Sequence, residues 1–383
     1  MGGTWSGHWM TAERIYRIKE QLDDMLIEAA INAKVVTPDN YVVRDILPKT
    51  DFGSTYYDNE EWETAQNIGG DDWETAVNVS LDGDKLIGFY GALGPSTQGV
   101  VAIRFKEGDA VKDVWQVQSR RVGLMTSGAT SGTAFEEGFL AIVGENEQII
   151  YAQDSNIVID FYGTASAAAD DTTVLLGRVI ERPGKNIMGS TDKTRTRAGL
   201  LPWFMVTPEM IEQKRRALDA ELIRRAREQG IIESDRYVLR DILPNTDFGS
   251  TYYAHEDWEG AISLTASGWK TIISVDLDSD KLIGFYGYLG PDDNVTALRF
   301  KVGGAIVKDI WMLEQTRMGE LSTPSGTATD EFQRAHFGLA RTPIIYNGED
   351  TLVVEAYGAV GASGTFKGIL LGRVIEPQGR VVS

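Results

Sequence analysis

Two stretches of the chain repeat apolar residues at steps of three and four, the spacing of one face of an α-helix. They are Thr11–Ala33 and Thr207–Gln229, and in both the opposite face carries Glu, Asp, Lys and Arg. The threonine that opens each stretch suits an N-cap, and Gly230 suits a C-terminal stop. The pattern therefore predicts two amphipathic helices.

After each helix the pattern changes to alternation, as in Val-Asn-Val-Ser-Leu and Ile-Val-Ile-Asp-Phe-Tyr, and turn-forming residues separate the alternating runs. Roughly eight strands following one helix favour an antiparallel β-sandwich, for which the jelly roll is the commonest eight-stranded form. An immunoglobulin-like strand order stays open, because strand order is not readable from the pattern. In the first half the predicted strands are Tyr41–Leu47, Ala76–Leu81, Lys85–Gly91, Val100–Lys106, Ala110–Val117, Gln148–Ala152, Ile157–Gly163 and Thr173–Ile180.

The second half of the chain repeats the first. Tyr41–Tyr57 reads YVVRDILPKTDFGSTYY, and Tyr237–Tyr253 reads YVLRDILPNTDFGSTYY, an offset of 196 residues. The same offset relates Asp84–Gly91 to Asp280–Gly287, both of which read DKLIGFYG. Matches of this length in constant register indicate a tandem duplication.

The duplication sets the predicted fold and domains. We expect a mainly β protein with two tandem β-sandwiches, jelly-roll-like, each preceded by an amphipathic α-helix. Residues 1–185 form the first helix and sandwich, and residues 201–383 form the second. Residues 186–200 are polar, basic and rich in small side chains, so they are expected to be the linker.

Composition narrows the function classes. The net charge of −19 should repel nucleic acid and anionic membranes, so direct nucleic-acid binding is not expected. The chain has no Cys and only three widely separated His, which excludes disulfides and thiolate metal sites and argues against a His cluster or a Ser-His-Asp triad. No apolar run approaches the roughly 20 residues of a membrane span. We therefore expect neither a cofactor nor a metal, and no enzyme activity.

Carboxylates near tryptophan were weighed as catalytic pairs of the glycosidase kind. Asp45, Asp51 and Glu60 precede Trp62, and equivalent residues precede Trp258. In so acidic a chain, carboxylates in loops are expected by abundance alone. The simpler interpretation is that these residues have no catalytic role.

The block Asp-Ile-Leu-Pro-x-Thr-Asp-Phe-Gly-Ser-Thr-Tyr-Tyr occurs twice almost unchanged, and a tryptophan follows it each time. One interpretation is a contact surface anchored by aromatic side chains. The other is a structural corner at which an aromatic covers the edge of the core. The candidate interface residues are Tyr56, Tyr57, Trp62, Tyr252, Tyr253 and Trp258.

The apolar stripe of each helix needs a partner, because a sandwich fills its core from its own two inner faces. The partner is the outer face of the same sandwich, the other repeat or a neighbouring chain. The basic face of the second helix and the acidic total favour a neighbouring chain or an acidic patch.

A helix and an eight-stranded sandwich, duplicated in one chain of 383 residues, resemble the double jelly-roll major capsid proteins of icosahedral viruses. In that family three chains form a capsomer with pseudo-six-fold symmetry. The resemblance is one of architecture and transfers no site residues. It implies a self-assembling structural protein of the virion, made in the host cytoplasm, whose partners are copies of itself in a trimer or lattice and other virion proteins.

Two alternatives remain. A carbohydrate-binding module would use some of the nine Trp and fourteen Tyr as stacking platforms. A surface-layer protein would also self-assemble, on the outside of a cell. Exposed aromatic side chains on one sheet face would favour the carbohydrate-binding module.

Overall fold

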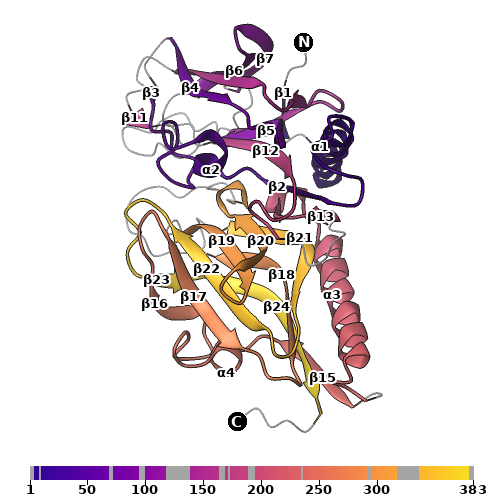
Figure 1. Ribbon diagram of the computed structural model, residues 1–383. Helices are drawn as coiled ribbons and strands as arrows, with labels where there is room; N and C mark the ends of the chain where they lie inside the picture. The colour runs from indigo at the N-terminus through magenta and orange to yellow at the C-terminus, as the bar shows by residue number, and fades with distance from the viewer. Residues whose placement is uncertain are drawn as a thin grey trace. The chain divides into compact units, whose positions relative to one another are not determined.

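The computed structural model describes residues 4–7, 10–68, 72–94, 100–117, 139–163, 169–170, 173–188, 195–233, 236–290, 295–316 and 336–378. Its contacts divide the chain into two units. Of the described residues, those up to 185 together with 195–196 belong to unit 1, and the rest belong to unit 2. Figure 1 labels the helices and strands of both units.

The described residues of unit 1 form one long helix, two large sheets and one two-stranded sheet. The helices are α1 (Ala12–Asn32) and α2 (Pro48–Phe52). The strands are β1 (Thr4–Ser6), β2 (Tyr41–Asp45), β3 (Asn67–Ile68), β4 (Trp73–Ser80), β5 (Lys85–Gly94), β6 (Val100–Glu107), β7 (Ala110–Gln116), β8 (Phe139–Val143), β9 (Ile149–Tyr151), β10 (Asn156–Gly163), β11 (Ala169–Asp170), β12 (Val174–Glu181) and β13 (Arg195–Arg197), of which Arg197 is counted with unit 2.

Unit 2 repeats this order. Its helices are α3 (Pro208–Glu228), α4 (Pro244–Phe248) and the short 3-10 turns η3 (Trp203–Met205) and η4 (Glu314–Thr316). Its strands are β14 (Leu200–Pro202), β15 (Tyr237–Asp241), β16 (Glu259–Ser263), β17 (Trp269–Asp276), β18 (Leu282–Gly290), β19 (Val295–Val302), β20 (Ile306–Met312), β21 (His336–Tyr346), β22 (Thr351–Gly358), β23 (Thr365–Lys367) and β24 (Ile369–Pro377).

Strand order identifies the sandwich type. In unit 2 the larger sheet runs β14-β21-β18-β24-β15 and the smaller one runs β17-β22-β19-β20. The eight principal strands, numbered one to eight along the chain, are β15, β17, β18, β19, β20, β21, β22 and β24. Read from β15, the larger sheet has the order one-eight-three-six. Read from β17, the smaller sheet has the order two-seven-four-five. That is the jelly-roll order, and it excludes the immunoglobulin-like alternative. Unit 1 has the same order, with β8-β5-β12-β2 facing β4-β10-β6-β7.

The strands predicted in the first half all occur, with ends that differ by a few residues. The sixth strand differs most, because Gln148–Ala152 contributes only β9 and a second segment, β8, also pairs with β5. Unit 2 makes this strand in one piece, as β21. Residues 189–194 of the expected linker lie outside the described residues, and 195–197 form β13 beside β2.

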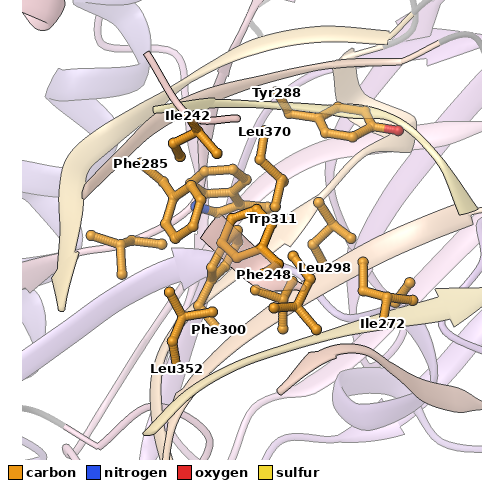
Figure 2. Packing of buried hydrophobic residues seen from close by; sticks show 14 of the residues in the cluster. Ile242, Phe248, Ile272, Phe285, Tyr288, Leu298, Phe300, Trp311, Leu352 and Leu370 are labelled. Atoms are coloured by element: carbon orange, nitrogen blue, oxygen red, sulfur yellow. The ribbon is translucent and has the colours of Figure 1, made fainter. Parts of the chain in front are cut away.

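The core of each sandwich contains a row of aromatic side chains that pack on one another with tilted rings. Trp311 on β20 packs on Phe300 on β19, with ring centroids 4.2 Å apart, and Phe300 continues to Phe285 on β18. Figure 2 shows these rings among Ile242, Leu298, Leu352 and Leu370. Unit 1 repeats the row, with 4.3 Å between Trp115 and Phe105.

Each long helix covers the outer face of the larger sheet of its own unit. Helix α1 packs on β5, β12 and β2, and α3 packs on β18, β24 and β21 (Figure 1). The expectation that favoured a neighbouring chain is therefore corrected. The physical reason is a glycine under each helix: a Cβ on Gly88 would lie 2.5 Å from Leu22, and one on Gly284 would lie 2.5 Å from Leu218. Because no side chain stands there, the helix can approach the sheet closely.

Candidate functional site

The repeated block, Asp45–Tyr57 in unit 1 and Asp241–Tyr253 in unit 2, forms a corner after the first sandwich strand. In unit 1 it begins in β2, makes the single turn α2 and leaves it through Gly53, whose φ of 88° is one that only glycine adopts easily. Gly249 does the same in unit 2, with a φ of 85°. The near-identical sequence of the block is thus explained by the shape of a turn.

A bidentate ion pair between Arg44 and Asp51 holds the corner to the sheet. Arg44 Nη1 and Nη2 donate hydrogen bonds to the two carboxylate oxygens of Asp51 at 2.7 and 2.9 Å. The same guanidinium donates to Glu181 on β12 at 3.0 and 2.8 Å, and Lys85 lies 3.4 Å from Asp51. Burial by itself raises the pKa of the Asp51 carboxyl, but the Arg44 and Lys85 cations and the Leu47 N–H bring that pKa below its ordinary value. Charge on Asp51 therefore stabilises the folded corner.

Unit 2 builds the same cluster. Arg240 donates to both oxygens of Asp247 at 2.8 Å and to Glu376 at 3.0 Å, and Lys281 lies 2.7 Å from Asp247. We call these two sets, Arg44-Asp51-Lys85-Glu181 and Arg240-Asp247-Lys281-Glu376, the corner clusters. Neither leaves a carboxylate free to act as an acid or base, because each is taken up by a fixed cation.

A second charged set ties each long helix to its sheet. In unit 1, Arg178 on β12 donates to Asp23 on α1 at 2.9 Å and pairs with Asp45, which Lys19 on α1 also contacts at 3.3 Å. In unit 2 the equivalent residues are Arg373, Asp219, Asp241 and Arg215. We call these the helix clusters. The unit 1 cluster is fully buried, whereas the Asp241 side chain is 69% exposed.

The six candidate interface residues divide by burial. Tyr57, Trp62 and Tyr253 are buried, and they pack on Phe52 and Phe248 of the corners. The corner interpretation therefore describes these three. Tyr56, Tyr252 and Trp258 are partly exposed, and for them contact with a partner stays a prediction. The structure brings Tyr57 together with Trp62 and Tyr253 together with Trp258, with 5.6 Å between ring centroids in each pair.

Aromatic side chains on the smaller sheets bear on the carbohydrate alternative, as does Trp5 on β1, which is 56% exposed. Trp73 packs edge-on to Tyr162, and Arg104 lies over the Trp73 ring at 4.3 Å. In unit 2, Arg299 covers Trp269 in the same way at 4.2 Å. A guanidinium on the indole face occupies the surface on which a sugar ring would stack. These clusters do not form an open platform.

Sequence reasoning missed the exposed apolar residues on edge strands. Val111 and Val114 on β7 are 55% and 43% exposed, Val238 on β15 is 37% exposed, and Ile306 on β20 is 41% exposed. Strands β7, β15 and β20 each end a sheet of the described residues. A signal existed for Val114, because strand alternation places it opposite the buried Asp113 and Trp115.

In the described part of the chain, no cluster of three or more His, Asp or Glu side chains is arranged to hold a metal ion. The Asp82 and Asp84 carboxylates are bound by Lys185, at 3.4 and 2.6 Å. The helices of this part include none with the length and apolarity needed to span a membrane.

Comparisons with known proteins find no matching family and no matching curated protein. Among solved structures, the chain is 12% identical to that of the infectious bursal disease virus Gx strain, over 83% of this chain and 60% of that one, with a TM-score of 0.19. It is 7% identical to PBCV-1 VP54, fitted into a reconstruction of the virophage Sputnik, over 89% and 94% of the two chains, with a TM-score of 0.18. It is 10% identical to the CUB1-EGF-CUB2 domain of human MASP-1/3, over 88% and 98%, with a TM-score of 0.14. The chain thus spans about 60% of the length of the first viral protein, and TM-scores this low carry no conclusion about function.

Proposed function

We propose that this chain is a structural protein that assembles with copies of itself. The observation that carries the proposal is the exposed apolar side chains on edge strands, above all Val111 and Val114 on β7. A free edge presents unpaired N–H and C=O groups, and proteins that stay monomeric protect such edges with charges, prolines or bulges. Strand β7 has one register shift, at Lys112, but it exposes Val111 and Val114 on either side of that shift, as a strand that pairs with a neighbour would.

The duplication supports the same proposal. Two jelly rolls in one chain carry related edge strands, β7 and β20, and fusing two subunits halves the number of association events. The two edges are not identical, because Ile310, the counterpart of Val114, is buried and the Val307 carbonyl oxygen accepts a hydrogen bond from the Met188 N–H. Jelly rolls are a common architecture of capsid proteins. The finer proposal is therefore a capsid protein or another structural protein of a virion, in which chains form trimers or a lattice with other virion proteins.

The negative net charge of the chain is more consistent with a shell-forming structural protein than with a nucleic-acid-binding protein. A net charge of −19 repels phosphate backbones, so the proposal includes no direct contact with a genome. It also includes no catalysis, since the carboxylates of the corner clusters are all paired with fixed cations.

Light scattering after size exclusion, with electron microscopy of the same fractions, tests the proposal. We expect the full chain to form defined particles or oligomers as its concentration rises. Replacing both Val111 and Val114 with lysine places charges on the β7 edge, and should raise the concentration needed for assembly at least tenfold. The matched control is Val360→Lys, at a residue equally exposed but in a turn.

Two results would count against the proposal. One is a full chain that stays monomeric over a wide concentration range in gentle buffer. The other is a Val360→Lys variant that impairs assembly as much as the β7 double variant, because the edge would then have no special part. Circular dichroism of each variant separates lost assembly from lost folding.

A further inference from the structure

The first sandwich strand has a neighbour on both sides in unit 1 but on one side in unit 2. Strand β2 lies between β12 and β13, whereas among the described residues β15 pairs only with β24. The two strands are nearly the same peptide, Tyr-Val-Val-Arg-Asp in β2 and Tyr-Val-Leu-Arg-Asp in β15. Nearly the same strand sequence is therefore paired on both sides in unit 1, and among the described residues it is paired on one side in unit 2.

The segment that pairs with β2 is short and basic. Strand β13 reads Arg-Thr-Arg, and the sequence before it is Thr-Asp-Lys-Thr. Arg195 of this segment forms an ion pair with Asp39, which lies two residues before β2. In sequence, Asp235 stands at the matching place two residues before β15. Asp235 lies outside the described residues, so it is the sequence alone that gives both repeats an acidic residue before this strand.

Burial follows the pairing. Val42 on β2 is fully buried and its counterpart Val238 on β15 is 37% exposed. An exposed valine on an open edge is what remains when the neighbouring strand is missing.

We propose that the open edge of β15 binds an extended basic segment of another polypeptide, which adds to the sheet as β13 adds beside β2. Backbone hydrogen bonds would supply the pairing, and an arginine placed like Arg195 would supply the ion pair. In each chain residues 195–197 already pair with β2, so the segment comes from a different protein and not from the linker of a second copy. The site does not depend on self-assembly, because a monomer carries the same open edge.

The absence of cysteine from the chain gives a direct test. The full-length Val238→Cys variant is mixed with a peptide of residues 191–198 in which Thr196 is replaced by cysteine, activated as a mixed disulfide with thionitrobenzoate. The thiolate introduced at position 238 attacks the peptide sulfur and releases thionitrobenzoate, and the protein–peptide disulfide is followed by mass. The matched control is full-length Val114→Cys, an equally exposed valine on the edge strand β7. We expect cross-linking at position 238 at least tenfold faster than at position 114.

Two further measurements use the unmodified chain. A fluorescent peptide of residues 191–198 should bind with an affinity at least tenfold above that of the same peptide with Arg195 and Arg197 replaced by glutamate. A peptide with proline at position 196 should also bind weakly, since proline removes a backbone donor. Hydrogen exchange should slow at residues 237–241 when the basic peptide is present.

Several outcomes would overturn the assignment. Equal cross-linking at positions 238 and 114, or equal binding of the basic and glutamate peptides, would show that the edge has no preference. Protection at residues 41–45 in place of 237–241 would mean that the peptide exchanges with β13. Val238→Cys chains that cross-link to one another faster than to the peptide would make a second copy the occupant.

Discussion

The two units share a fold but differ in how much of the long helix is buried against the larger sheet. Helix α1 buries seven residues against its sheet, including Lys19 and Asp23, whereas α3 buries three. At the place of the buried Ile18, α3 has the partly exposed Lys214. Unit 2 has therefore become more polar on its helix while the adjacent strand kept Tyr-Val-x-Arg-Asp unchanged.

The helix change has a local explanation. Lys214 is half-buried, and its ammonium donates a hydrogen bond to the carbonyl oxygen of Arg341 on β21. Among the described residues, Val238 has no such contact to explain it: an exposed strand position favours a polar residue, yet the residue there is valine. The unchanged strand beside a changed helix supports the view that β15 is held for pairing. The helix clusters allow the comparison to be tested directly.

The largest expected effect comes from removing the arginine of each helix cluster. Arg178→Met leaves Asp23 and Asp45 buried with one fewer cation, which should reduce the stability of unit 1 by about 3–5 kcal/mol. Arg373→Met should cost unit 2 only about 1 kcal/mol, because water reaches Asp241. Hydrogen exchange at increasing denaturant measures the unfolding free energy of each unit separately. Equal losses would show that burial does not set the difference.

The next effect tests how firmly each helix is held. Gly88→Ala places a methyl group 2.5 Å from Leu22 and 3.3 Å from the Ile149 carbonyl oxygen, under a helix that is buried along its length. We expect a loss of about 1–3 kcal/mol in unit 1 from this overpacking. The equivalent Gly284→Ala should cost less, because α3 is less enclosed and can shift.

The control for both glycine variants is Gly304→Ala, since a Cβ there meets no atom within 4 Å. Thermal unfolding followed by circular dichroism, together with exchange rates of the helix amides, gives the comparison. A Gly284→Ala variant as unstable as Gly88→Ala would mean that α3 is as tightly fixed as α1.

The hydrophobic pattern of the sequence was sufficient to locate the sandwich strands and long helices, but not to identify what each of them pairs with or packs on. Alternation located β4 and β7, because each has one face in the core and one outside, whereas β5 is buried on both faces and was located by its apolar run between turn residues. It could not locate β13, whose three residues alternate between Arg and Thr and gain order only by lying beside β2. Nor could it choose the partner of the helix stripe, since that choice depends on Gly88 and Gly284 lying beneath the helices.

The candidate site was predicted in part for a similar reason. The repeated block was correctly singled out, but its aromatic residues were open to two interpretations, and burial decides between them only for Tyr57, Trp62 and Tyr253. The role of Arg44 was missed, because its partners Asp51 and Glu181 are 7 and 137 residues away in sequence. A guanidinium that joins a corner to a distant strand is not visible in local spacing.

The corner clusters should respond to acid alike in the two units, in contrast to the helix clusters. Burial alone would raise the pKa of both Asp51 and Asp247, but the facing Arg and Lys cations bring each pKa below its ordinary value of 3.8. A carboxyl whose folded pKa is lowered contributes stability above its unfolded pKa and loses it as the pH falls through the folded value. Both units should therefore lose stability below about pH 4 with similar slopes.

Unfolding free energies measured by denaturant from pH 6 to pH 2.5 test this expectation. Asp51→Asn should flatten the acid loss in unit 1, and Asp247→Asn should flatten it in unit 2. Asp109→Asn, in the exposed turn between β6 and β7, is the control. If only unit 1 lost stability in acid, the two corner clusters would not be equivalent.

The smallest expected effect concerns the exposed face of α3, where α1 has no equivalent charge pairs at this position. Glu221 pairs with Arg224 and Arg225 one turn further on, and Met25 stands at its place in α1. The Arg224 hydrogen bonds, and then those of Arg225, outweigh desolvation and lower the pKa of Glu221 to about 2. Because the Glu221 carboxylate is largely in water, Glu221→Gln should cost at most about 0.5 kcal/mol.

The contribution of Glu221 should depend on pH and salt. Since the folded pKa is lowered, that contribution is present above about pH 4.5, fades as the pH falls toward 2, and is screened by salt. Amide exchange in α3 at low and high salt measures it, and a loss above about 1 kcal/mol that salt does not reduce would contradict an exposed, weakly held helix face.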